Sequence, residues 1–317
     1  MGKCTRDQTI AMSGLRQLLL MVIMVIPLLL SAQTKNNFWK KSDTLNTKRR
    51  SAVFLSEGVA ASVALIGLNQ LWYANYDRSG FHFFNDNNEW LQMDKAGHML
   101  TSYYTGKIGM SLLDWAGESK KNQLIYGATL GFAFLTTIEV LDGFSSEWGF
   151  SAGDMVANAS GTGLLIGQEL LWDEQRILLK YSFHTTRYSD LRPDTFGKNL
   201  FEQALKDYNG QTYWLSVNIW SFNKQSKFPK WLNIAAGYGA DNMLTGLSET
   251  PFDAPNYTTG KERYRQYYFS LDLDLTRIKT QSPFLKTVFS SLNFIKIPAP
   301  TIEFNPGGKP RFYWIYF

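Results

Sequence analysis

Residues 94–115 have the sequence DKAGHMLTSYYTGKIGMSLLDW. From Ala96 to Trp115 the residues are mostly apolar over about 20 positions, the length of a helix that crosses a bilayer. The first turn is polar, and the i, i+4 spacing places Asp94 and His98 on one face of the helix. The pattern predicts a long apolar helix that begins with ionisable groups.

Three other stretches have the same length and apolar character, and they cover residues 51–73, 124–141 and 155–172. Small residues recur four apart, Gly127 with Gly131 and Gly163 with Gly167, a spacing that favours close helix packing in lipid. We predict an apolar four-helix bundle embedded in a membrane. A water-soluble bundle is the alternative, since Gln70 and other polar residues interrupt the helices.

The C-terminal part changes period from helical to two. Tyr267, Phe269 and Leu271 alternate with Ser270 and Asp272, and residues 213–220 alternate in the same way. This alternation predicts antiparallel strands with one polar face in water, and residues 283–292 are predicted to form a helix. Only four or five strands are expected, whereas a membrane barrel needs at least about eight. The predicted fold class is therefore α+β, with a small sheet against the bundle.

The N-terminus is typical of a secretory signal peptide. Lys3, Arg6 and Arg16 precede the apolar run 18–30, and small residues around Ala32 follow it. We expect cleavage near Ala32. The predicted organisation is a signal peptide over 1–32, a helical domain over 33–210 that includes an amphipathic helix at 196–208, and a β-rich extension over 211–317.

Charge and cysteine content exclude several classes of function. Without residues 1–32 the net charge falls from +5 to about +3, too weak a bias to indicate nucleic-acid binding. The one cysteine, Cys4, lies in the predicted signal peptide, which excludes disulfides and cysteine chemistry from the mature chain. The expected partners are membrane lipid and another envelope protein.

The ends of the apolar helices carry a set of polar groups that is expected to converge. These groups lie at the starts of helices 96–115 and 155–172 and at the end of helix 124–141. A hairpin arrangement brings these three ends together. The set consists of Asp94, Lys95, His98, Glu139, Asp142, Ser151, Asp154 and Asn158.

Several of these groups also have an ordinary structural explanation. Asp94 suits a helix start, and Ser151 with Asp154 has the capping-box spacing. Glu139 and Asp142 oppose the dipole at a helix C-terminus, so a positive partner is expected: Lys95, protonated His98 or a metal ion. Ionisable groups in apolar surroundings are functional candidates.

A divalent metal is the one cofactor that this set suggests. Its candidate ligands are His98, Asp94, Glu139 and Asp142, since carboxylate oxygens and an imidazole suit such a cation. A lipid headgroup or acid/base chemistry with Glu139 or Asp142 as base are alternatives, and no residue is assigned a catalytic role.

The ordered motif resembles a known family. Asp94-Lys95-x-x-His98, Glu139-x-x-Asp142 and Ser151-x-x-Asp154-x-x-x-Asn158-x-x-Gly161 are similar to the YfiM-type family of uncharacterised envelope proteins, described as predicted periplasmic lipoproteins. The acid pair and the Ser-x-x-Asp-x-x-x-Asn segment are more distantly similar to VanZ-like membrane proteins. Two features depart from the family: the cysteine of a lipoprotein signal is missing, and about 100 strand-rich residues follow the motif.

The resemblance implies an exported protein of the cell envelope, and the aromatic last strand 313–317, which ends at Phe317, resembles the sorting signal of outer-membrane proteins. An ordinary last strand is the alternative for that segment. We expect a non-enzymatic outer-membrane protein facing the periplasm, whose polar cluster binds an ion or a lipid headgroup. The alternatives are a metal-assisted or acid/base enzyme acting on an envelope lipid or glycan precursor, and an assembly partner that uses an edge strand near 213–220 or 313–317.

Overall fold

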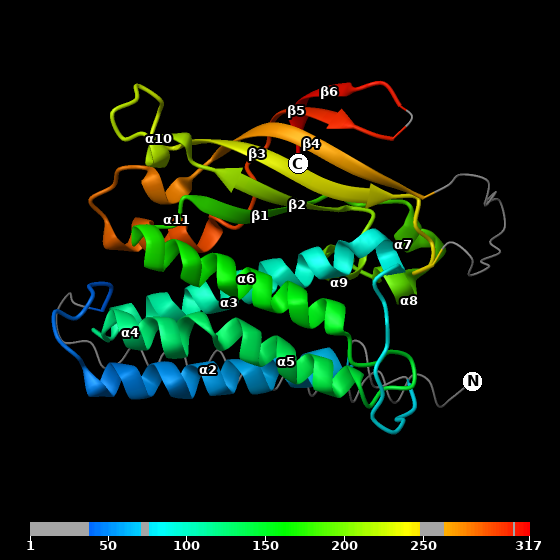
Figure 1. Ribbon diagram of the computed structural model, residues 1–317, viewed down its shortest axis with the longest axis horizontal. Coiled ribbons are helices and arrows are strands. Elements are labelled where there is room, and N and C mark those ends of the chain that lie inside the picture. The colour runs from blue at the N-terminus through cyan, green and yellow to red at the C-terminus, as the bar shows by residue number, and fades with distance from the viewer. Residues whose placement is uncertain (1–37, 71–75, 248–262, 307) are drawn as a thin grey trace. The chain divides into compact units, whose positions relative to one another are not determined.

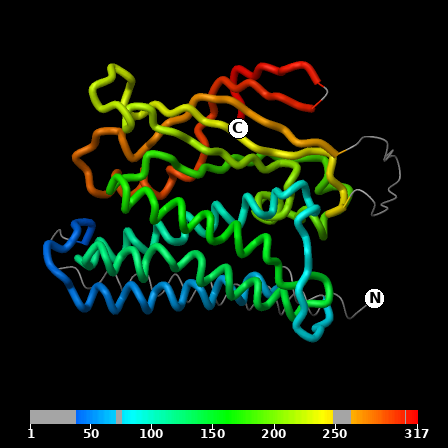
Figure 2. Tube along the Cα trace, viewed as in Figure 1, coloured from blue at the N-terminus to red at the C-terminus, as the bar shows by residue number. Residues whose placement is uncertain are grey.

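The computed structural model describes residues 38–70, 76–247, 263–306 and 308–317. The chain divides after Lys41, and the residues from Ser42 to Phe317 form one unit. In this unit a layer of helices packs beside one face of an antiparallel sheet, as Figures 1 and 2 show. The combination of helices and an antiparallel sheet agrees with the predicted α+β class.

Each of the four apolar stretches contains a long helix. Their bounds are α2 (Thr47–Leu68), α3 (Met93–Trp115), α5 (Leu130–Asp142) and α6 (Ala152–Trp172). The short helix α4 (Lys120–Asn122) and the π-helical turn η3 (Gln123–Ala128) lead into α5. Helix α3 lies at the centre of the layer and packs against α6, η3 and α5.

Small residues allow α3 to approach its neighbours closely. A Cβ added at Gly131 would clash with the Ser102 carbonyl, and one at Gly161 would clash with the Met99 carbonyl. The predicted packing role therefore holds for Gly131. It does not hold for Gly163 and Gly167, where an added Cβ would have no neighbour within 4 Å among the described residues.

The membrane-embedded form of the four-helix bundle is not confirmed. Among the described helices, two segments are long and apolar enough to cross a membrane, Thr47–Leu68 and Lys120–Asp142. In α2 Val53 is the one described residue that is fully buried, and the other residues of the helix are half-buried or exposed. Helices α3 and α6 instead have buried polar side chains at their contact, including Ser102 and Asn158.

The sheet has six described strands, more than the four or five expected, and each pairs antiparallel with the next in sequence. Their bounds are β1 (Ile177–Phe183), β2 (Gln211–Val217), β3 (Leu232–Asp241), β4 (Tyr264–Leu273), β5 (Ala299–Phe304) and β6 (Arg311–Tyr316). Strand β2 is paired on both sides, so of the two edge strands that the assembly alternative named, the one near 213–220 is excluded. Strand β6 is the last of the order, as expected for 313–317.

Short helices fill the connections: η2 (Glu89–Gln92), α7 (Tyr188–Leu191), α8 (Pro193–Phe196), α9 (Leu200–Lys206), α10 (Ile219–Phe222), η4 (Leu275–Arg277) and α11 (Pro283–Leu292). The helix predicted at 283–292 is confirmed as α11. The amphipathic helix predicted at 196–208 is confirmed only over Leu200–Lys206, because Gly197 has φ +101 and separates Phe196 from it. Helix α9 then starts anew, with the Asn199 side chain accepting from the Glu202 N–H.

The predicted orientation of the strand faces is also wrong. The polar residues Ser270 and Asp272 of β4 are buried, and their apolar neighbours Phe269 and Leu271 are exposed. Strand β2 follows the same rule, with Ser216 buried. The sheet thus has its polar face inside and much of its apolar face outside.

Candidate functional site

Three helix ends meet at one end of the helical layer: the starts of α3 and α6 and the end of α5 (Figure 1). Helices α3, α5 and α6 pack against one another, so side chains on these ends lie close together. The cluster is completed by the loop before η2, which supplies Asp86, and by the turn after α9, which supplies Tyr208.

The backbone that leads into α3 has an uncommon conformation. Trp90, Leu91 and Gln92 have φ values of 45, 50 and 64 degrees, in the left-handed region that residues other than glycine rarely adopt. The Trp90 N–H donates to the Gly246 carbonyl at 2.8 Å, and the Tyr238 hydroxyl donates to the Leu91 carbonyl. Contacts with β3 and with the loop after it therefore hold a strained turn just before Asp94, and strain of this kind is concentrated at functional sites.

His98 is oriented by the partners of its Nδ1 atom. Nδ1 lies 3.0 Å from the Asn158 Oδ1 atom and 3.7 Å from the Glu139 Oε1 atom. An amide oxygen can only accept, so Nδ1 carries a proton. In the neutral ring this leaves the lone pair on Nε2, which faces Asp94 Oδ2 at 3.8 Å.

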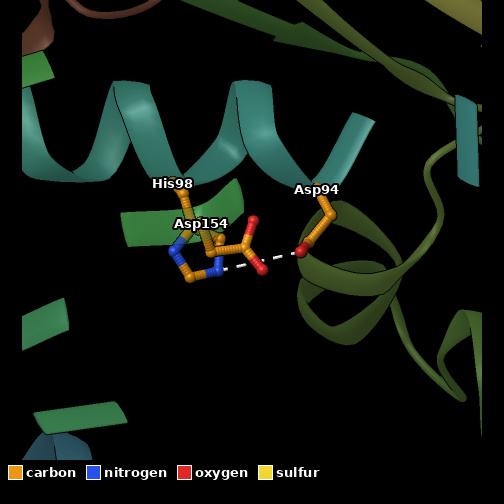
Figure 3. Close-up of side chains that lie close together, drawn as sticks. All are labelled: Asp94, His98 and Asp154. Carbon is orange, nitrogen blue, oxygen red and sulfur yellow. Dashed lines mark ion pairs between the residues drawn. The ribbon is translucent and has the colours of Figure 1, made fainter. Parts of the chain in front are cut away.

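Asp94, His98 and Asp154 form the centre of the site (Figure 3). One carboxylate oxygen of each acid and one imidazole nitrogen lie within 4.8 Å of one another. The Tyr208 hydroxyl donates to Asp94 Oδ1 at 2.6 Å, and this bond leaves Oδ2 toward the histidine. Lys95 Nζ lies 3.1 Å from Asp154 Oδ1. The Asp154 side chain also hydrogen-bonds Asp86, so both acids are held by neighbouring side chains.

Lys95 and Ser151 belong to a second layer of contacts around Asp86. Lys95 Nζ lies 2.8 Å from Asp86 Oδ1, and the Ser151 hydroxyl donates to the same oxygen at 2.6 Å. Ser151 also caps α6, because its hydroxyl accepts from the Asp154 N–H at 3.1 Å. The cap expected for Ser151 is confirmed, and the same side chain ties the helix start to the loop.

Glu139 is 1% exposed and is only partly satisfied. Its Oε2 atom accepts from the Ser151 N–H at 3.0 Å. Glu139 Oε1 and Asn158 Nδ2 are buried and have no hydrogen-bond partner among the described residues, a costly arrangement. Both atoms belong to side chains that contact the Nδ1 side of the imidazole.

The group of possible ligands in the structure therefore differs from the set predicted from sequence. Glu139 faces Nδ1, the opposite side of the ring from the group of three, and Asp142 is also outside that group. Asp154, which was expected in the cluster but not as a ligand, takes their place beside Nε2. Asp142 lies at the end of α5, one turn beyond Glu139.

Burial and neighbouring charges shift the pKa values of Asp154 and His98. Burial and the neighbouring Asp94 charge raise the pKa of Asp154 to about 8. For His98 burial acts to lower the pKa, but the charges of Asp94, Asp154 and Glu139 outweigh it and the pKa is raised. Both groups hold a proton more tightly than in water, as expected where carboxylates outnumber cations.

Asp86 and Tyr208 are members of the site that were not predicted. Asp86 lies in an asparagine-rich loop that resembles an ordinary turn, and Tyr208 is more than 100 positions from its partner Asp94. The signal for Tyr208 is its place beside the turn residues Asn209-Gly210, directly after an amphipathic helix.

Residues 79–167 match the sequence model of a family described as predicted periplasmic lipoprotein (DUF2279). The matched segment contains Asp86, Asp94, His98, Glu139, Asp154 and Asn158, and it confirms the resemblance to the periplasmic lipoprotein family. The relation to VanZ-like proteins is not shown. No curated protein and no solved structure matches the chain. The family description supports an exported, envelope-associated protein.

Proposed function

We propose that this protein is a non-enzymatic component of the outer membrane, facing the periplasm, that holds a divalent cation between Asp94, His98 and Asp154. The observation that carries the proposal is the approach of their three ligand atoms to within 4.8 Å of one another. For metal bonds of 2.0–2.2 Å, ligand atoms lie roughly 3.4 Å apart. Small side-chain rotations close this difference.

The contacts around the three ligands are those that a metal site needs. A ligating histidine usually donates its other N–H to a carboxylate or carbonyl group. His98 does this through Nδ1, with Asn158 Oδ1 as acceptor. Asp94 is held through Oδ1, which leaves its Oδ2 atom for the cation, and Asp154 is positioned by Lys95 and by a side-chain hydrogen bond with Asp86.

The balance of charge also favours a cation. Asp86, Asp94, Glu139 and Asp154 are four acids in one cluster, and Lys95 is the amine that contacts two of them. A bound divalent ion offsets the remaining negative charge, and one imidazole with two carboxylates suits a borderline ion such as Zn²⁺.

Burial favours a role in holding the ion over a role in catalysis. Glu139, Asp154 and Asn158 are all buried, and the Asp94 side chain keeps 31% exposure. The ion would join the start of α3 to the start of α6 and so fix the central helix pair.

The test is the metal content of the purified mature protein, with Zn²⁺ re-added after chelation and dialysis. We expect about one ion per chain in the wild type and loss of the ion in His98→Ala and Asp94→Asn. His82→Ala is the matched control, because it removes another of the three histidines and leaves the cluster intact. A wild type without metal, or equal metal in His98→Ala, would contradict the proposal.

A further inference from the structure

The outer face of the sheet is apolar, and helices cover it at β1 and β2 but leave β4 exposed. Tyr267, Phe269 and Leu271 of β4 are 42–50% exposed, whereas Ser270 and Asp272 between them are 1% exposed. Water-soluble antiparallel sheets show the reverse, with apolar side chains inward. Apolar-out and polar-in alternation is the pattern of strands that face lipid.

The inner face encloses a connected polar core. Lys180 and Asp272 form an ion pair at 2.8 Å, with both side chains 0% exposed. Ser216 donates to Asp272 at 2.7 Å, and Asn233 donates to Ser216 at 2.9 Å. Because these buried polar groups bond to one another, their hydrogen bonds stabilise a sheet whose inner face is polar and whose outer face is apolar.

The chain between α11 and β5 helps to enclose this core. The Tyr181 N–H donates to the Phe294 carbonyl at 2.8 Å, and the Lys296 N–H donates to the Tyr181 carbonyl at 2.8 Å. Residues 294–296 thus cover the free edge of β1, and the same segment continues into β5, which pairs with β4. The curled sheet therefore turns its apolar side chains outward on the strands that no helix covers.

The apolar face extends from β2 to β6, with large exposed side chains on β2, β4, β5 and β6. Its exposed large side chains are Leu215, Tyr267, Phe269, Leu271, Phe304 and Phe312. The registers place Phe269 opposite Ala236 on β3 and opposite Ile302 on β5, so the surface continues without a charged residue between them.

Basic and aromatic side chains bound this face at both ends of the strands. Before β3 lie exposed Lys230 and Trp231, and Lys230 Nζ lies 4.4 Å from the centre of the Trp220 ring. At the opposite end Arg263 and Arg265 line a cavity of about 450 Å³ together with Tyr267. Guanidinium groups and interfacial aromatic rings complement anionic lipid headgroups.

We propose that the outer face of β3–β6 lies against phospholipid, with acyl chains on Phe269 and its apolar neighbours and headgroup phosphates near Arg263 and Arg265. The uncharged band and its cationic ends complement a lipid that has an apolar tail and an anionic head. The inference is independent of the cation site, because none of its residues belongs to that cluster.

The test is a spin label at Phe269→Cys in a Cys4→Ser background, which leaves one cysteine. The protein is reconstituted in phosphatidylethanolamine–phosphatidylglycerol bilayers, and collisions of the label with oxygen and with a water-soluble nickel chelate are compared. We expect oxygen to dominate at Phe269→Cys. Lys224→Cys, on an exposed loop, is the matched control, where the nickel chelate should dominate.

Two results would overturn the proposal. Nickel access at Phe269→Cys equal to that at Lys224→Cys would show that the face lies in water. Loss of access to both reagents, with spin–spin broadening at full labelling, would show that a second copy of the chain covers the face.

Discussion

Glu139 combines nearly complete burial with an incomplete set of hydrogen bonds. Its Oε2 atom satisfies the Ser151 N–H, and its Oε1 atom lies beside the His98 ring without a hydrogen-bond partner among the described residues. At this position the charge and the hydrogen bond can be separated by substitution, since glutamine keeps an acceptor for Ser151 and alanine does not.

We predict that Glu139→Ala destabilises the protein by about 1–3 kcal/mol more than Glu139→Gln, because alanine leaves a buried N–H unsatisfied. Chemical denaturation of both variants beside the wild type measures the difference. If the two variants unfold at the same denaturant concentration, the bond from Ser151 to Glu139 does not hold the start of α6.

The site residues that could be predicted from sequence are those that contact residues within one helical turn of them in the chain. The spacing of Asp94 and His98 and the cap formed by Ser151 follow from helix geometry, and both agree with the structure. The contacts of Asp86 and Tyr208 depend on how a loop and a distant turn pack against α3. The choice between Glu139 and Asp154 beside Nε2 depends on the rotation of His98, which no spacing encodes.

At the scale of the elements, periodicity predicted the long helices and several strands, but it did not predict which face of the sheet is buried. A period of two separates Ser270 and Asp272 from Phe269 and Leu271, and it does not say which pair faces water. The partners that bury Asp272, such as Lys180, come from other strands. The break at Gly197 likewise required a backbone angle that the helical pattern of 196–208 conceals.

The polar core of the sheet leads to a prediction about pH through Lys296. Burial lowers the pKa of Lys296 from its ordinary value of 10.5 to about 8. Between these values the unfolded chain binds a proton that the folded chain does not, so this group makes folding less favourable as the pH falls from 10.5 to 8. Its contribution to stability therefore rises with pH in this window.

The measurement is the change in Tm between pH 8 and pH 9.5 for the wild type and for Lys296→Met. Subtracting the change in Lys296→Met from the change in the wild type removes the effect of the titratable groups that both proteins share. We expect a more positive change in the wild type than in Lys296→Met. Identical changes in the two proteins would show that Lys296 titrates as it does in water.

At the scale of the whole molecule, the family match covers residues 79–167, which contain the acids of the cluster and His98 but none of the sheet. The sheet and Tyr208 follow that segment, and their relation to it is visible only in the fold. The long helices and the family were therefore accessible from sequence, whereas the inverted sheet and the completed cluster required tertiary contacts.

The most direct test of a cation that joins α3 to α6 is the thermal unfolding of the purified protein with and without a chelator. A ligand at 100 times its Kd stabilises the folded state by about 2.7 kcal/mol, so its removal should lower the Tm clearly. We predict this loss for the wild type and for His82→Ala, its reversal by Zn²⁺, and no loss for His98→Ala. An unchanged Tm in the wild type, or an equal loss in His98→Ala, would contradict the account.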